Sequence, residues 1–363
     1  MKRKIVFTGG GSAGHVAANL VLMSRLLKED WDIHYIGSKH GIERQLVGDL
    51  EYVQYDAVAT GKLRRYWAWA NVMDLFKIMI GVLQAFRLIL RIKPSVVFSL
   101  VGFVAVPVVV SARSNRDPVL ILEPDLHPGL ANRLSRKFAR TMCTTFEETA
   151  VSDRHMDGKI VHVGPRTEIG QSCSWHPTLC EFIDGKPILL IMGGNQGAER
   201  INRMVREVLP EMIRSYQVIH ICGTGKMDLY IQHNKGYKQF EYVREELPDL
   251  MAMADLVVSR AGSNAIHEWL LLRKPMLLIP HTNGGSRMGQ TMNAICFRNA
   301  GYAELLHEED MTNQAFLKAV ENVYQNRKSY VDKMERIKTV DAANKVLALI
   351  NETERTRKER TGV

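Results

Sequence analysis

Cysteine is scarce in this sequence, and long apolar runs are missing. The 363 residues include five cysteines, an odd number with no Cys-x-x-Cys pair. This pattern argues against a disulfide framework or a zinc site and favours a reducing compartment. No apolar stretch reaches the roughly 18 uncharged residues of a membrane-spanning helix. The first apolar run covers only residues 5–7, which is too short for a signal peptide.

The composition that is present is that of a globular protein. Hydrophobic residues make up 46% and charged residues 24% of the chain, which excludes disorder, collagen and coiled coil for its bulk. The length predicts two domains. Lys and Arg number 48 against 39 Asp and Glu, a net charge of +9. This excess predicts an anionic partner, which could be nucleic acid, a lipid surface or a phosphorylated substrate.

Short apolar runs alternate with helical stretches, and the pattern starts twice. Parallel strands in βαβ units show this alternation. The first half has predicted strands at residues 4–8, 33–36, 96–99, 119–122 and 159–163, with helices at 15–27 and 72–92. The second half has predicted strands at residues 187–192, 217–222, 256–259 and 276–280. We therefore expect two doubly wound α/β domains joined by a linker at 171–186, and a frayed charged end at 352–363.

A glycine loop with the spacing Gly-x-Gly-x-x-Gly follows the first predicted strand at Gly9, Gly11 and Gly14. Such a loop lets the backbone approach an anion at a helix N-terminus. The next strand ends at residues 35–38 without a carboxylate, which disfavours a nicotinamide cofactor. His15 falls in the first helical turn, where the helix dipole keeps an imidazole neutral and suits it as a general base. The alternative is that His15 only caps or packs the loop.

Three further segments lead from a strand into a helix, at residues 193–198, 259–268 and 280–294. In the second, Glu268 could accept hydrogen bonds from ribose hydroxyls, and in the third, the Gln290 amide could read sugar hydroxyls. Glycine turns occur in any α/β fold, and Glu268 could equally be a solvated helix carboxylate. Four such turns at the carboxyl ends of strands favour a nucleotide-binding cleft.

Taken in order, these loops resemble those of the MurG family of bacterial cell-wall glycosyltransferases. The matching segments are residues 8–16, 102–107, 123–133, 164–166, 193–198, 259–268 and 290–294. The family transfers GlcNAc from UDP-GlcNAc to undecaprenyl-diphospho-MurNAc-pentapeptide (lipid I), making lipid II with inversion. The resemblance implies a GT-B fold, in which two facing Rossmann-like doubly wound domains hold the nucleotide sugar in a cleft between them.

The resemblance also implies a division of labour along the chain. Residues 1–164 would bind the acceptor and the membrane, with a helix at about 340–363 packing back on them. Residues 165–339 would bind the UDP-sugar donor. The donor is a substrate, and the reaction would need no cofactor or metal, because helix dipoles and backbone N–H groups stabilise the leaving diphosphate.

Individual roles follow from the matching positions. The resemblance assigns catalysis to His15 and Asp125. It assigns donor binding to Arg166, Asn195, Gly262, Ser263, Glu268 and Gln290. It assigns acceptor binding to Gly11, Ser12, Gly14, Gly102 and Glu123.

The sequence departs from the family pattern at Val101, Asp125, Asn195 and Gly289, mostly on the acceptor side or beside the donor phosphates. These departures leave three alternatives open. The chain could use a different lipid or a secondary metabolite as acceptor. It could be a non-catalytic UDP-sugar-binding paralogue. It could also be a UDP-sugar epimerase of the same fold.

The positive charge is concentrated in one aromatic segment. Residues 1–165 carry 22 basic and 15 acidic residues, and residues 61–93 alone carry seven basic residues and one acid. An amphipathic helix of this kind can lie in an anionic lipid interface, or it can be a core helix with snorkelling cations. We expect membrane contact through Arg64, Arg65, Trp67, Trp69 and Phe76. We therefore expect a peripheral protein on the cytoplasmic face of the membrane, with cell-wall synthesis complexes as candidate partners and no nucleic-acid partner.

Overall fold

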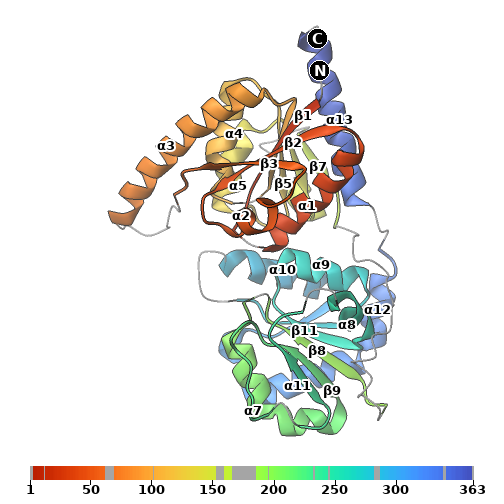
Figure 1. Cartoon of the computed structure of the whole chain (residues 1–363). Helices are drawn as coiled ribbons and strands as arrows, with labels where there is room; N and C mark the ends of the chain where they lie inside the picture. Colours follow the sequence, from red (N-terminus) through yellow and green to blue (C-terminus); the bar gives the residue numbers. More distant parts are fainter. Residues whose placement is uncertain are drawn as a thin grey trace. The chain divides into compact units, whose positions relative to one another are not determined.

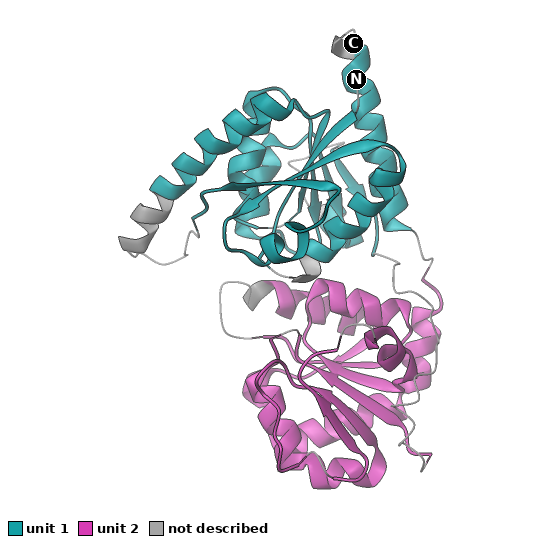
Figure 2. Ribbon diagram, in the orientation of Figure 1, with its two compact units in different colours: residues 1–165, 340–363 teal, residues 166–339 magenta. Residues whose placement is uncertain are grey.

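The chain divides into two compact units (Figure 2), which are described separately. Unit 1 comprises residues 1–165 and 340–363, and unit 2 comprises residues 166–339. The structure is a computed structural model. It describes residues 3–11, 13–61, 69–100, 102–152, 159–165, 185–194, 196–231, 234–243, 246–281, 287–337 and 341–361.

Unit 1 is built on a parallel sheet of seven strands in the order β3-β2-β1-β4-β5-β6-β7. The strands are β1 (Arg3–Thr8), β2 (Trp31–Ser38), β3 (Val53–Val58), β4 (Val96–Leu100), β5 (Val119–Glu123), β6 (Thr141–Thr144) and β7 (Ile160–His162). The helices are α1 (Ala13–Lys28), α2 (Ile42–Val47), α3 (Trp69–Ile92), α4 (Ala105–Ser114), α5 (Leu130–Ser135), α6 (Glu147–Ser152) and α13 (Ala342–Thr361). The strand order reverses between β1 and β4, the position at which doubly wound sheets bind ligands.

Unit 2 has a parallel sheet of six strands in the order β10-β9-β8-β11-β12-β13. The strands are β8 (Ile188–Met192), β9 (Gln217–Ile221), β10 (Tyr237–Phe240), β11 (Leu256–Ser259), β12 (Met276–Leu278) and β13 (Ala303–Leu305). The helices are α7 (Glu199–Ser215), α8 (Leu247–Met253), α9 (Ser263–Leu271), α10 (Arg287–Ala300), α11 (Asn313–Gln325) and α12 (Arg327–Met334). Here the order reverses between β8 and β11.

Helices cover both faces of the sheet in unit 1 (Figure 1). Successive side chains of a strand point to opposite faces. Ile5 and Phe7 of β1 are fully buried in a cluster with α1 and α13, whereas Val6 is fully buried in a second cluster with α3 and α4. Burial on both faces explains why β1 is apolar without alternation.

The expected two doubly wound α/β domains are confirmed, and the predicted helices at 15–27 and 72–92 correspond to α1 and α3. Four strands were not predicted: β3, β6, β10 and β13. Each is an outer strand or carries polar residues, so its apolar signal is weak. The predicted linker at 171–186 lies almost wholly outside the described residues. None of the described helices is long and apolar enough to cross a membrane.

The prediction of a frayed end at 352–363 is wrong, because α13 continues to Thr361 and buries Thr353 and Glu354. Arg357 anchors this helix to unit 1. Its guanidinium lies 2.6 Å from the Asp117 carboxylate and donates to the carbonyl of Pro94. The Asp117 side chain is fully buried. Asp117 precedes Arg357 by 240 positions in the sequence. The low apolar content of residues 352–363 therefore does not reveal the ion pair that holds this part of α13 in place.

We predict that Arg357→Ala destabilises unit 1 by about 2–3 kcal/mol, because it leaves the buried Asp117 carboxylate without its cation. Chemical denaturation followed by circular dichroism measures this loss. Arg273→Ala is the matched control, since Arg273 pairs with Glu335 on the surface of unit 2 with both side chains about half exposed. That variant is expected to lose less than about 1 kcal/mol. Equal losses in the two variants would contradict the anchoring role of Arg357.

Candidate functional site

The loops that follow β1 and β4 interlock through glycines at the strand-order reversal of unit 1. Gly9 and Gly102 have φ values of 138° and 137°, which side chains rarely adopt. A Cβ atom at Gly102 would lie 3.0 Å from the backbone N and O of Gly10. A Cβ atom at Gly9 would lie 2.6 Å from the carbonyl oxygen of Leu100. Glycine at both positions therefore allows the two backbones to touch.

The open part of this loop faces the start of α1. Gly11 has a φ of 91°, and a Cβ atom there would meet nothing within 4 Å. Gly14 and His15 belong to the first turn of α1, as expected. The N–H groups of a first helical turn have no partner within the helix. This edge can therefore bind an anion or a polar ligand.

A buried network that the sequence interpretation missed supports the loop from behind. Tyr35 in β2 donates to the carbonyl of Gly9 over 2.8 Å and accepts from the amide of Asn19 over 3.2 Å. The Glu43 carboxylate on α2 accepts from the N–H and hydroxyl of Ser38. A carboxylate therefore does lie at the end of β2, but it is buried. The Gly37–Gly41–Glu43 pattern was the available signal.

A second carboxylate cluster follows β5. Glu123 is fully buried and accepts from the amide of Asn132 over 2.9 Å and from the N–H of Asp125 over 3.0 Å. Burial, reinforced by the charge of Asp125, raises the pKa of Glu123 to about 8. Asp125 is partly exposed. Glu123 is therefore protonated at neutral pH and holds the loop that presents Asp125. Asn132 was not singled out from the sequence.

In unit 2, the start of α9 presents its backbone at the strand-order reversal. Gly262 is the residue before the helix, and a Cβ atom there would meet nothing within 4 Å. The buried Ser263 follows it, and its carbonyl is 2.8 Å from the ring Nδ1 of His267. The buried amide of Asn293, on α10, donates to the carbonyl of Ala261 over 3.2 Å. These contacts fix an open helix N-terminus that suits a diphosphate.

Glu268 and Gln290 belong to the two helices that flank this opening. Glu268 is partly exposed on the second turn of α9. Gln290, on α10, accepts the N–H of His281 with its side-chain oxygen over 2.9 Å. This bond leaves the amide N–H₂ as the group that Gln290 can offer to a sugar hydroxyl.

Several predicted site residues lie outside the described residues: Ser12, Arg64, Arg65, Trp67, Arg166 and Asn195. His15 and Trp69 are placed on α1 and α3 by their backbone alone. The structure therefore brings Gly102 against Gly10, the residue before Gly11, in unit 1, and it places Glu123 and Asp125 beside each other. In unit 2 it places Gly262, Ser263 and Glu268 on α9.

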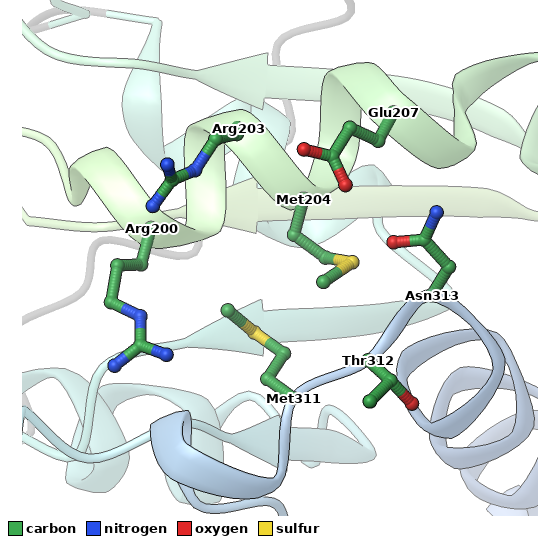
Figure 3. Close-up of a pocket in the computed structure, with 7 residues that line it drawn as sticks. All are labelled: Arg200, Arg203, Met204, Glu207, Met311, Thr312 and Asn313. Atoms are coloured by element: carbon green, nitrogen blue, oxygen red, sulfur yellow. The ribbon is translucent and has the colours of Figure 1, made fainter.

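A cavity of about 450 Å³ opens between α7 and the segment that leads into α11 (Figure 3). Arg200 and Arg203 lie at one end, Glu207 at the other, and Met204 and Met311 between them. None of the four predicted donor-binding residues that the structure describes, Gly262, Ser263, Glu268 and Gln290, lines this cavity. We therefore assign it no part in the donor site.

Comparison with known proteins identifies both halves of the chain. Residues 5–144 match the glycosyltransferase family 28 N-terminal domain, and residues 188–348 match the glycosyltransferase family 28 C-terminal domain. A Geobacillus thermodenitrificans protein is 48% identical over 98% of this chain and its own full length. It is named UDP-N-acetylglucosamine–N-acetylmuramyl-(pentapeptide) pyrophosphoryl-undecaprenol N-acetylglucosamine transferase. A Bacillus cereus protein of the same name, numbered 3, is 47% identical over 97% of this chain and 99% of its own.

Among solved structures, MurG of Acinetobacter baumannii has a similar fold. It superposes with a TM-score of 0.77 at 22% identity, covering 96% of this chain and 99% of its own. The fold of the chain is thus the one expected from the ordered loops.

We predict that Glu123 makes unit 1 less stable as pH rises. The pKa of Glu123 in the folded protein is raised above its value in the unfolded chain. Its contribution to the free energy of unfolding is therefore complete below about pH 4.5 and is lost as the pH rises through about 8. Glu123→Gln imitates the protonated carboxyl and should flatten this dependence. Unfolding free energies measured at pH 5, 6.5 and 8 for both proteins test it. A slope that Glu123→Gln leaves unchanged would show that another group titrates.

Proposed function

The chain belongs to glycosyltransferase family 28, and we propose that it transfers GlcNAc from UDP-GlcNAc to lipid I on the cytoplasmic face of the membrane, making lipid II. The enzyme class is an N-acetylglucosaminyltransferase with a GT-B fold. One observation carries the proposal: relatives that bear the name of this activity match the chain along nearly its whole length.

The proposed reaction is a single displacement. A hydroxyl oxygen of the acceptor sugar attacks the anomeric carbon of GlcNAc, and the bond from that carbon to the diphosphate oxygen breaks. The hydroxyl proton passes to a base, for which we propose His15 at the first turn of α1. UDP leaves with the bonding electrons.

Unit 2 supplies the donor contacts in this proposal. The backbone N–H groups at Gly262 and Ser263 face the diphosphate and stabilise the charge that develops on it. Glu268 accepts from the ribose hydroxyls, and the Gln290 amide donates to a GlcNAc hydroxyl. Arg166 and Asn195 complete the donor contacts by resemblance to the family.

Unit 1 supplies the acceptor contacts. Gly11 is the open position of the first glycine loop, and Gly102 lies against the backbone of Gly10 in the same loop. Ser12 and Gly14 complete the acceptor contacts by resemblance to the family. Protonated Glu123 holds the segment that carries Asp125, which we propose assists catalysis beside the acceptor.

Helix α3 carries a surface that suits a lipid interface. Phe76, Met79, Ile80 and Leu83 recur at helical spacing and are each at least half exposed. The opposite side of the helix, at Ala85, Ile89 and Ile92, is buried in the core of unit 1. We define Phe76, Met79, Ile80 and Leu83 as the α3 apolar stripe.

Cations border this stripe, as an anionic membrane requires. Lys77, Arg87 and Arg91 all lie on α3, and Arg91 is held by Asp56 over 2.9 Å. A lipid-linked acceptor lies in the membrane, so a peripheral enzyme must reach that surface. The stripe supports the proposed location on the cytoplasmic face.

We predict that the purified protein forms lipid II and UDP from labelled UDP-GlcNAc and a lipid I analogue. His15→Ala removes the proposed base and should lower kcat by about 10²–10⁴-fold. Glu268→Ala removes a ribose contact and should raise the KM for UDP-GlcNAc by about tenfold or more. Absence of transfer by well-folded wild-type protein would refute the proposed acceptor, and product without acceptor would indicate an epimerase.

We predict that the pair Phe76→Ser and Leu83→Ser weakens binding to vesicles of anionic phospholipid by about tenfold or more, because two exposed apolar side chains no longer enter the interface. Co-sedimentation with the vesicles measures this loss. Leu229→Ser with Tyr230→Ser is the matched control, since both side chains are highly exposed but lie on unit 2. The assignment of the membrane-binding surface to the α3 apolar stripe is wrong if the control variant loses as much vesicle binding as the α3 variant.

A further inference from the structure

Glu43 carries an unusual buried carboxylate directly behind the first glycine loop. Only 2% of the residue is exposed. One carboxylate oxygen accepts from the N–H of Ser38 over 3.0 Å and from its hydroxyl over 2.5 Å. The other oxygen is buried and has no hydrogen-bond partner within the described part of the chain. Among the described residues, no lysine, arginine or histidine forms an ion pair with it.

Glycine backbones form the walls around this carboxylate. A Cβ atom at Gly10 or at Gly41 would lie 2.4 Å from a Glu43 oxygen, and one at Gly37 would lie 3.0 Å from its Cγ. None of these three glycines has the positive φ that alone would require glycine. Space for the Glu43 side chain therefore excludes larger residues from Gly10 and contributes to excluding them from Gly41, whereas at Gly37 the ring of Tyr55 would lie closer to a Cβ atom than Glu43 does.

Such an arrangement costs stability. Burying a carboxylate with only one residue to donate to it is unfavourable, and an apolar side chain would fill the space at lower cost. A buried polar group without a partner in a native fold calls for an explanation beyond packing. The explanation lies in what the carboxylate touches.

Gly10 is clamped between Glu43 on one side and Gly102 on the other. The next residue, Gly11, is the open position of the loop, and α1 begins two residues later. A shift of Gly10 would therefore move the loop that follows β1, its contact with the loop that follows β4, and the entry into α1 together.

We propose that Glu43 is a positioning residue for the acceptor: its carboxylate fixes Gly10, and thereby sets the two acceptor loops of unit 1. This inference rests on the proposed function, because it assigns the loops to the acceptor. Glu43 touches neither substrate and acts through the backbone of Gly10. Its removal therefore affects use of the acceptor, which unit 1 binds, and spares use of the donor, which unit 2 binds.

The first test compares Glu43→Ala with Glu43→Gln in the transfer assay with a lipid I analogue. Glu43→Ala empties the space behind Gly10 and should lower kcat/KM for the acceptor by about tenfold or more, since misplacement by about 1 Å can cost about 100-fold. The KM for UDP-GlcNAc should stay within about twofold. Glu43→Gln keeps the length of the side chain and an oxygen that can accept from Ser38, so it should restore acceptor use to within about threefold of wild type.

Gly41→Ala provides a second test that leaves Glu43 itself in place. Gly41 lies outside the glycine loop and has φ and ψ of −79° and 167°, which alanine adopts without strain. The added methyl displaces the carboxylate, so Gly41→Ala alone should lower acceptor kcat/KM severalfold. In the Glu43→Ala background it should cost little more, because the carboxylate is gone and the Ser38 hydroxyl, which the methyl also meets, no longer has to point at it. Additive losses in this double-mutant cycle overturn the proposal.

Other results separate this inference from the proposed function. Wild-type protein that transfers no GlcNAc to lipid I overturns both. Active wild-type protein with unchanged acceptor kinetics in Glu43→Ala overturns only the role of Glu43. The role of Glu43 is also overturned if Glu43→Ala raises the KM values for donor and acceptor equally. It is likewise overturned if Glu43→Gln loses as much acceptor kcat/KM as Glu43→Ala does. Melting temperatures recorded for each variant confirm that the kinetic comparison is made on folded protein.

Discussion

The close approach of two backbones, at Gly10 and Gly102, is the constraint on which the proposed acceptor side depends. Both sheets bury their central strands on two faces, so polar chemistry is confined to the ends of the strands. In unit 1 the loops at that edge meet without side chains between them, because glycines at positions 9 and 102 adopt positive φ values. The first turn of α1 is then presented at the point where the strand order reverses. A larger residue at position 9 or 102 would push the two loops apart and displace the proposed acceptor contacts.

Much of this organisation could be predicted from the sequence, because the signals are local. Fully buried parallel strands such as β4 and β5 are continuous apolar runs, and the glycine loops follow directly from such runs. The strands that escaped prediction have weak patterns. β6 contains two threonines, β10 has two adjacent polar residues among its four, and β13 is three residues long.

The support behind the site could not be predicted, because it depends on residues that are distant in the sequence. Asn132 reaches Glu123 only after α5 folds back on β5. Tyr35 reaches Gly9 only when β1 and β2 pair. The end of β2 was expected to lack a carboxylate, and the fold brings one there from α2 as Glu43. Charge and low apolar content suggested a frayed end at 352–363, whereas a distant buried carboxylate, Asp117, holds that helix in place.

The return of α13 to unit 1 has a consequence for biosynthesis. A nascent chain leaves the ribosome N-terminus first, and N-terminal domains therefore usually fold before C-terminal ones. Here residues 166–339 emerge complete, whereas the hydrophobic core of unit 1 still lacks Ala343, Val346, Leu347 and Ile350. Unit 2 can therefore reach its native state first, although it comes second in the chain. Until α13 has emerged, the nascent first unit exposes the apolar surface that this helix will cover, and it is then most open to chaperones and to premature association.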